Sequence, residues 1–303
     1  MEPELAAAYE RCRQLHRQHG RTYYLATRLL PPWKRPHVHA LYGFTRYADE
    51  IVDRTDAYPV QERGRQLRAW SERFLAGLHG APVNDPILPA VLHTIEAFDL
   101  DRNDFASFLE SMTMDLTVTS YADYGALLSY MEGSAAVIGT MMLPILESVD
   151  PVAAREPARQ LGLAFQLTNF IRDVGEDLDR GRIYLPLADL ERFGVSRTDL
   201  RHAVADRRGS RGSRDLIAFE VARAREHYAA AAPGIPLLAP SSQACIRTAF
   251  HVYGAILDEI ERAGHDVFVR RAVVPNHRRL GMLARCLLTP AGTPIAVPAS
   301  GVS

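Results

Sequence analysis

The sequence has few cysteines and no pattern that would pair them. Its 303 residues include three cysteines, Cys12, Cys245 and Cys286, which lie far apart and form no CxxC pair. An odd number of cysteines without ligand-like spacing predicts neither a disulfide framework nor a zinc site, and it favours a reducing compartment. We therefore expect a cytoplasmic protein.

An excess of charge of one sign and long apolar runs are also lacking. Lysine and arginine number 35 against 36 aspartates and glutamates, which gives a formal net charge of −1. This balance argues against a nucleic-acid partner, because such proteins usually carry a basic face. The N-terminus is charged and has no apolar signal core. No run approaches the ~18 apolar residues of a transmembrane helix, so we predict no membrane-spanning segment.

Helical periodicity, in contrast, is present along most of the chain. Hydrophobic residues make up 47% of the sequence, which is enough for a sizeable core. Their spacing is helical and shows no strand-like alternation. The predicted helices cover residues 36–52, 62–78, 87–98, 123–146, 155–179, 219–228 and 243–262.

The breaks between these segments do not divide the chain into separate domains. Proline and glycine are dense around Pro31, in 80–89, at Pro186 and in 233–240. We predict one all-α domain over residues 1–288. The basic, Gly/Ser-rich stretch 205–214 is predicted as a mobile loop, and the Pro/Gly/Ala-rich residues 289–303 as a disordered tail.

Two acidic patterns carry the chemistry. In each pattern the polar residues recur at intervals of three or four, which places them on one face of a helix. The first pattern consists of Asp49 and Asp53, and the second of Gln166, Asn169, Asp173 and Asp177.

The surroundings of the second pattern are apolar, so its helix should be largely buried. Buried carboxylates need a cation or a basic partner. Oxygen ligands without cysteine or clustered histidine suit Mg²⁺, which takes one or two carboxylates and completes its shell with water and phosphate oxygens. Two such helices facing each other would form a cage for a diphosphate. The spacing alone leaves a structural salt-bridge network equally open.

The residues around both patterns resemble the phytoene/squalene synthase family, and bacterial phytoene synthases in particular. The order and separation of the matching blocks also fit, over about residues 15–275. The resemblance implies a helical bundle of the isoprenoid-synthase type around a central cavity. The blocks are HGRTYY at 19–24, LLP at 29–31, ALYGFTRYADEIVD at 40–53, QLTNFIRDVGED at 166–177 and RGRIYLP at 180–186.

The resemblance also implies roles for individual residues. The implied cofactor is Mg²⁺, for which Mn²⁺ can substitute, and the implied ligands are Asp49, Asp53, Asn169, Asp173 and Asp177. The implied catalytic residues are Arg46, which binds a diphosphate, and Tyr42 and Tyr130, which flank the reacting carbons. The implied substrate-binding residues are His19, Arg21, Thr22, Thr27, Ser134, Gln166, Tyr253 and Arg270, of which Tyr253 and Arg270 close over the diphosphate.

The implied activity is that of a prenyltransferase. Two geranylgeranyl diphosphates would condense head to head, through a cyclopropylcarbinyl diphosphate, to phytoene. No redox cofactor is expected for phytoene, whereas squalene formation would need NADPH. Thr27 and His39 stand where shorter-chain members of the family carry bulky aromatics, which favours a C20 substrate. A water-insoluble product also leaves peripheral contact with a membrane open, and the oligomeric state is not predicted.

Several alternatives remain at this point. Ser134 replaces an apolar residue of the family pattern, and with Glu132 it would suit a polar pocket that passes the prenyl cation to an aromatic acceptor. A squalene or dehydrosqualene synthase using farnesyl diphosphate is a second alternative. A non-enzymatic scaffold is disfavoured because all four motif aspartates are retained. The pair His265-Asp266 lacks the second histidine pair of an HD phosphohydrolase, and we expect it at the surface.

Overall fold

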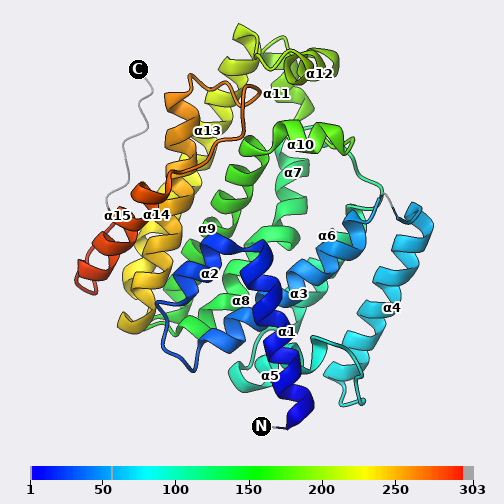
Figure 1. The fold of residues 1–303 in the computed structure, drawn as a ribbon, viewed down its shortest axis with the longest axis vertical. Helices are drawn as coiled ribbons and strands as arrows, with labels where there is room; N and C mark the ends of the chain where they lie inside the picture. Colours follow the sequence, from blue (N-terminus) through cyan, green and yellow to red (C-terminus); the bar gives the residue numbers. More distant parts are fainter. Residues whose placement is uncertain (1, 56, 296–303) are drawn as a thin grey trace.

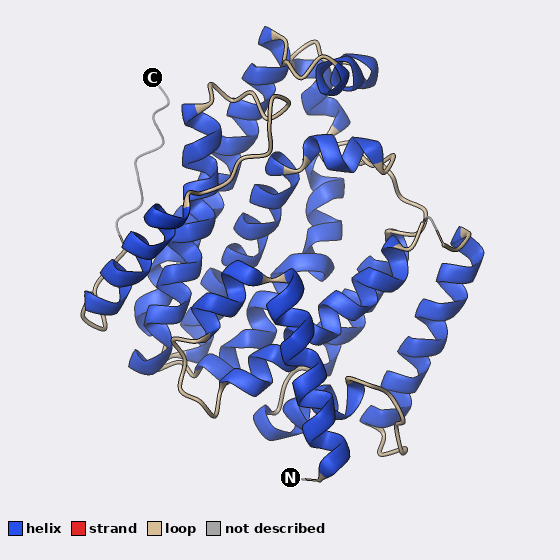
Figure 2. Cartoon of the chain, viewed as in Figure 1, coloured by secondary structure: helices blue, strands red, loops and turns tan. Residues whose placement is uncertain are grey.

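The computed structural model describes residues 2–55 and 57–295, and within this part of the chain it contains helices and no strand (Figure 1, Figure 2). The prediction of an all-α fold is therefore confirmed. The only strand-like pairings among these residues are two isolated bridges, Ser120 with Ile183 and Ser148 with Leu238.

Fifteen α-helices, one π-helical segment and one 3₁₀ segment follow one another in the described residues. They are α1 (Pro3–His19), α2 (Arg21–Thr27), α3 (Arg35–Asp53), α4 (Val60–Leu78), α5 (Leu88–Phe98), α6 (Arg102–Met114), α7 (Tyr124–Met131), η1 (Glu132–Ala136), α8 (Val137–Leu146), α9 (Pro151–Arg172), α10 (Val174–Asp179), α11 (Leu187–Arg192), α12 (Arg197–Ala205), α13 (Arg211–Ala231), η2 (Ala232–Leu237), α14 (Pro240–Arg262) and α15 (Asn276–Leu288).

The helix predicted at 123–146 is interrupted by η1, where the chain accommodates one extra residue per turn. Gly133 makes the close packing of η1 against α6 feasible, because a Cβ at this position would collide with the backbone of Ser107. The stretch Tyr124–Leu146 has the length and hydropathy of a membrane span, with a mean hydropathy of 1.3, contrary to the prediction. However, 56% of this apolar window is buried within the protein, between α6 and α9.

The helix predicted at 155–179 breaks at Asp173. The backbone of this residue has φ −103° and ψ 13°, so α9 ends at Arg172 and α10 begins at Val174. The predicted stripe of Asn169, Asp173 and Asp177 therefore does not lie on one continuous helix.

Two other predictions about the chain are wrong in part. The predicted loop 205–214 is shorter, because Ser210 caps α13 by accepting a hydrogen bond from the Ser213 amide, so the helix begins at Arg211. Asp266, expected at the surface, is buried and accepts hydrogen bonds from the Gly209 amide. This contact anchors the loop between α12 and α13.

The predicted disordered tail differs from the structure as far as residue 295. Arg247 of α14 donates hydrogen bonds to the carbonyl oxygens of Pro290 and Thr293, and the Gly292 amide donates to Gln243. Residues 289–295 are therefore held against α14. The remainder, 296–303, lies outside the described residues.

The hydrophobic core forms two clusters, and the functional site lies between them. One cluster centres on Phe44, against which Trp70, Phe74 and Phe105 pack in tilted or edge-on geometry, at ring distances of 4.9–5.1 Å. The other gathers α9, α13 and α14 around residues such as Leu167. Helix α3 belongs to the first cluster and α9 to the second. The two acidic patterns are thus carried by the two halves of the bundle.

Candidate active site

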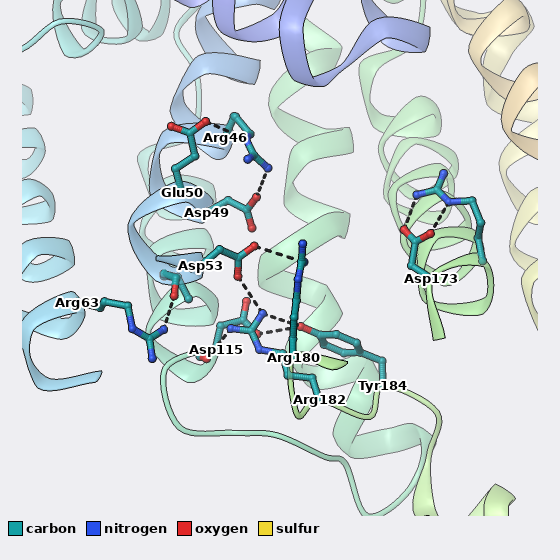
Figure 3. A network of polar contacts seen from close by, with 12 residues as sticks. Arg46, Asp49, Glu50, Asp53, Arg63, Asp115, Asp173, Arg180, Arg182 and Tyr184 are labelled. Carbon is teal, nitrogen blue, oxygen red and sulfur yellow. Dashed lines mark hydrogen bonds and ion pairs between the residues drawn. The ribbon is translucent and has the colours of Figure 1, made fainter. Parts of the chain in front are cut away.

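A polar cavity opens between α3 on one side and α9 and α10 on the other. Both acidic patterns line it, which confirms that the two aspartate-bearing segments face each other. Figure 3 shows Asp49 and Asp53 descending along one helix, with Asp173 on the far side. The residues predicted from the sequence that line it are His19, Tyr42, Arg46, Asp49, Asp53, Tyr130, Ser134, Gln166, Asn169, Asp173, Asp177 and Tyr253.

On the α3 side, arginine and carboxylates alternate along one helix face. Arg46 Nη1 donates to Asp49 Oδ2 at 2.7 Å, and Arg46 Nε donates to Glu50 Oε1 at 3.2 Å. The Asp49 side chain is 42% exposed, and it lines the polar cavity. Desolvation, reinforced by the charge of Asp53, raises the pKa of Asp49 to about 7. Arg46 therefore does not fully neutralise Asp49.

On the opposite side, Asp173 and Asp177 experience different environments. Asp173 accepts paired hydrogen bonds from Arg172, at 2.7 and 2.5 Å, and from Arg271, at 2.8 and 3.0 Å. Burial alone would raise the pKa of Asp173, but these two guanidinium groups hold it below its usual value. Burial and the neighbouring Asp173 raise the pKa of Asp177 to about 7. Asp177 is thus the less neutralised of the two.

A network of hydrogen bonds closes one end of the polar cavity. Arg182 Nη1 donates to Asp53 Oδ1 at 3.1 Å, and Arg182 Nη2 donates to the backbone oxygen of Asp115 at 3.0 Å (Figure 3). The Tyr130 hydroxyl donates to Asp115 Oδ2 at 2.8 Å. Burial raises the pKa of Asp115 to about 6, although Arg182 and Tyr130 oppose the shift. Tyr130 is therefore oriented by a carboxylate that no sequence pattern indicated.

An apolar cavity continues from the polar one into the bundle. The two cavities share Tyr23, Tyr42, Ser134, Gln166 and Asn169 as lining residues. Beyond this junction the wall is almost entirely hydrocarbon, made by residues such as Leu41, Ile138, Met142, Leu161, Phe165, Leu238 and Ile246. A ligand with an anionic head and a long apolar chain would match both cavities at once.

Two polar atoms at this junction have no hydrogen-bond partner among the described residues. They are Ser134 Oγ and Asn169 Oδ1, and both are buried. An unpartnered buried oxygen is costly, and native proteins rarely retain one without a purpose. Asn169 lines both cavities, and Asp49, Asp53, Asp173 and Asp177 line the polar one, so its unpartnered oxygen suits a cation or a polar ligand group.

The family follows from the sequence match. Residues 16–278 match the squalene/phytoene synthase family. The chain belongs to this family.

Curated relatives and solved structures are similar over nearly the whole chain. A 15-cis-phytoene synthase from Synechocystis sp. is 40% identical, over 90% of this chain and 82% of that protein. A phytoene synthase from Arthrospira platensis is 36% identical, over 90% of both chains. The crystal structure of a dehydrosqualene synthase has a TM-score of 0.85 at 27% identity and covers 94% of this chain and 96% of that chain.

Not every residue expected from the squalene/phytoene synthase pattern reaches a cavity. Thr27 is buried and lines the apolar cavity, as expected for a wall residue. Arg21 and Arg270 are exposed, Thr22 is half-buried, and none of the three lines either cavity. The arginine that reaches the site from the segment after α14 is Arg271, one residue beyond the predicted position.

Further cavity residues of this family member went unpredicted or unassigned. Four residues that line the polar cavity are of this kind. Arg180, Arg182 and Tyr184 lie in a matching block of the sequence but were assigned no role, and no local pattern indicated Asp115. Among the residues raised as alternatives, Glu132 pairs with Arg159 and lines neither cavity. His39 stands behind His16, with their Nδ1 atoms 2.9 Å apart, and it is His16 that lines the apolar cavity.

Proposed function

We propose that this enzyme, a prenyltransferase of the squalene/phytoene synthase family, condenses two geranylgeranyl diphosphates head to head to form phytoene. The reaction would pass through a cyclopropylcarbinyl diphosphate. One observation carries the proposal: a polar cavity lined by both acidic patterns shares its inner lining with an apolar cavity. The similarity to phytoene synthases at 36–40% identity supports the C20 substrate over the C15 substrate of a squalene synthase.

We propose Mg²⁺ as the cofactor, held by Asp49, Asp53, Asn169, Asp173 and Asp177. The unpartnered oxygen of Asn169 and the under-neutralised carboxylates of Asp49 and Asp177 fit such an ion. No group of three or more acidic, histidine or cysteine side chains in the described residues could hold a metal alone. Mg²⁺ would need only one or two of these carboxylates and would complete its shell with water and substrate phosphate oxygens. When bound, Mg²⁺ neutralises the diphosphate and makes it a better leaving group.

The arginines around the cavity would hold the diphosphates in place. Arg46 and Arg182 stand on one side and Arg172 and Arg271 on the other, all paired with carboxylates in the absence of substrate. A diphosphate offers each guanidinium a second anion, so these side chains can exchange partners without losing their hydrogen bonds. Their positive charge would also stabilise the negative charge that develops as the carbon–oxygen bond breaks.

The junction of the two cavities would hold the reacting carbons. The rings of Tyr23 and Tyr42 line this junction, where an aromatic face can stabilise an allylic cation. Tyr130 lines the polar cavity beside it, oriented by Asp115. The hydrocarbon walls beyond exclude water, which would otherwise capture the cation.

The proposal is tested by incubating the purified protein with Mg²⁺ and geranylgeranyl diphosphate alone, followed by mass analysis of the apolar extract. We expect a C40 hydrocarbon, with no acceptor or reductant added. Chelation should abolish its formation. The proposal would be refuted if a product formed only when an aromatic acceptor was supplied and that product was a prenylated aromatic compound. Full activity in EDTA would also refute it.

The acidic patterns are tested separately by Asp49→Asn and Asp173→Asn. Both substitutions should abolish turnover while the helical circular dichroism stays unchanged, because each removes a charge but keeps the side-chain volume. Asp215→Asn, which changes an exposed carboxylate on α13, is the matched control and should retain activity. Wild-type turnover in either acidic-pattern variant would contradict the assigned role.

A further inference from the structure

The C-terminal part of the chain carries positive charge without any negative charge. No aspartate or glutamate follows Asp266, whereas five arginines do, at 270, 271, 278, 279 and 285. Arg271 is paired with Asp173 and Arg278 with Glu259. Within the described residues, Arg270, Arg279 and Arg285 form no ion pair. Arg270 and Arg285 are exposed, whereas Arg279 is half-buried with its Nε enclosed by protein, so this segment carries three guanidinium groups that no carboxylate of the described residues neutralises.

Exposed hydrophobic side chains gather in the same segment. Val269, Val273, Leu280, Leu287 and Leu288 are each more than half exposed, and Leu288 is 84% exposed. On α15, Leu280, Leu287 and Leu288 are separated by seven and eight residues, which places them on one face of the helix. The half-buried Arg279 lies on one side of this face, and the exposed Arg285 lies on the other, at the groove between α14 and α15. Exposed apolar residues clustered in this way, rather than scattered singly, mark an interaction surface.

The opposite face of α15 explains why the helix is held in place. Cys286 is buried, and Arg278 pairs with Asp258 and Glu259 of α14. Helix α15 therefore lies along α14 at the edge of the bundle (Figure 1), and these three leucines are exposed whereas Cys286 is buried. The three exposed leucines therefore belong to a folded helix that is packed on the bundle.

The chemistry of this face points to one occupant. We propose that the outer face of α15, defined by Leu280, Leu287 and Leu288 with Arg279 and Arg285, docks on an anionic lipid surface. A short helix with leucines on one face and arginines at its flanks lies in the membrane interface, with the leucines in the acyl boundary and the arginines at the headgroups. The absence of carboxylates after Asp266 removes the repulsion that anionic headgroups would otherwise meet.

The docking face is connected to the active site along the chain. The segment that leads from α14 into α15 contains the exposed Val269 and Val273, and between them Arg271 reaches Asp173 in the polar cavity. A membrane bound at α15 would therefore lie close to the residues that border the site. Lipid binding at α15 is separate from the proposed reaction, because it can be measured without turnover.

The experiment is co-sedimentation of the full-length protein with phosphatidylcholine vesicles, with and without phosphatidylglycerol. We expect binding to the anionic vesicles that weakens as salt is raised. Arg279→Gln and Arg285→Gln should each weaken it by about fivefold, from ~1 kcal/mol per arginine at an anionic surface. The triple variant Leu280→Ser, Leu287→Ser, Leu288→Ser should abolish it.

The matched control is Val149→Ser with Val152→Ser, which removes two hydrophobic side chains that are exposed elsewhere, at the start of α9. This variant should bind vesicles like the wild type. Circular dichroism and turnover in detergent micelles check that the leucine variant is folded. The proposal is overturned if the wild type does not bind anionic vesicles or if the leucine variant still binds them. It is also overturned if light scattering shows a dimer that the leucine variant converts to a monomer, because a second copy then covers this face.

Discussion

Arg182 donates a hydrogen bond from Nη1 to Asp53 Oδ1 at 3.1 Å and thereby ties the loop after α10 to the end of α3. The two residues lie 129 positions apart in the chain and come from the two halves of the bundle. The same guanidinium bonds the backbone of Asp115, so one side chain joins three segments at the wall of the polar cavity. Its loss should therefore affect stability as well as substrate binding.

Arg182→Met tests this role. Arg182 is only 13% exposed, and its removal leaves Asp53 and Asp115 without their main cation. Because the cavity admits water, we expect a cost of about 1–3 kcal/mol, below that of a fully buried pair, and a loss of activity. Thermal unfolding followed by circular dichroism measures the stability. Arg180→Met is the control, since Arg180 is 54% exposed and lies 3.7 Å from Asp53. Equal destabilisation by both variants would contradict the prediction.

Neighbouring arginines after α14 should differ sharply in function. Arg271 pairs with Asp173 at 2.8 Å, whereas Arg270 is exposed and lines neither cavity. We expect Arg271→Ala to lower kcat/KM by roughly tenfold, near the lower end for a hydrogen bond to a charged group, because Arg271 is half-exposed. Arg270→Ala should leave kcat/KM unchanged. Steady-state kinetics with both variants tests this difference. A loss of kcat/KM in Arg270→Ala but not in Arg271→Ala would restore the assignment of Arg270 drawn from the sequence.

A buried acidic pair far from the site should make stability depend on pH. Glu220 and Asp189 share Arg223, whose Nη1 lies 2.8 and 2.9 Å from their carboxylate oxygens. Burial raises the pKa of Glu220 to about 7, with Arg223 opposing the shift. A raised pKa in the folded state means that Glu220 contributes stability at low pH. This contribution is lost as the pH rises through about 7.

Glu220→Gln should therefore raise Tm relative to the wild type at pH 8 by a few degrees, at about 2–4 °C per kcal/mol. The difference should shrink at pH 5, where the wild-type carboxyl is protonated in the folded protein. Differential scanning calorimetry of the metal-free protein at both pH values makes the comparison. Glu191→Gln, on the exposed face of α11, should show no such pH dependence. A Tm difference independent of pH would refute the assignment.

The parts of the site that were predictable are those that rest on local geometry. Asp49 and Asp53 share a helix face because four residues make about one turn, so their spacing was sufficient to place them. Asp115 had no such pattern, and its position depends on how the end of α6 meets Arg182 and Tyr184. The break at Asp173 had no proline to indicate it, and the contact of its side chain with Arg271, 98 residues later, had no local pattern either.

The segment between α14 and α15 shows why single positions are hard to predict outside helices. Residues 267–275 have no periodicity that would distinguish the direction of one side chain from the next. Arg270 and Arg271 were therefore equivalent by composition, and only the path of the backbone separates them. The π-helical segment η1 presents the same difficulty inside a helix. Its extra residue shifts the register of Ser134 without any proline to indicate it.

Thr27 offers a test of chain length that leaves the ionising residues untouched. It is buried on α2, lines the apolar cavity, and donates its hydroxyl to the Tyr23 carbonyl oxygen at 2.8 Å. Thr27→Phe would place a ring in space that a C20 chain needs, whereas a C15 chain ends sooner. Overfilling a packed cavity typically costs ~1–3 kcal/mol, which corresponds to a roughly 5- to 150-fold loss in relative use of the longer substrate.

The measurement is kcat/KM for farnesyl and geranylgeranyl diphosphates in the wild type and in Thr27→Phe. We expect kcat/KM to fall selectively for the C20 substrate, while release of the first diphosphate from the C15 substrate continues. Thr22→Phe, on the same helix but lining neither cavity, is the control and should not change the ratio. Equal losses on both substrates would mean that Thr27 supports the fold or the diphosphate site instead. The chain-length argument for phytoene would then have to be withdrawn, because no side chain would remain that links the depth of the apolar cavity to the C20 substrate.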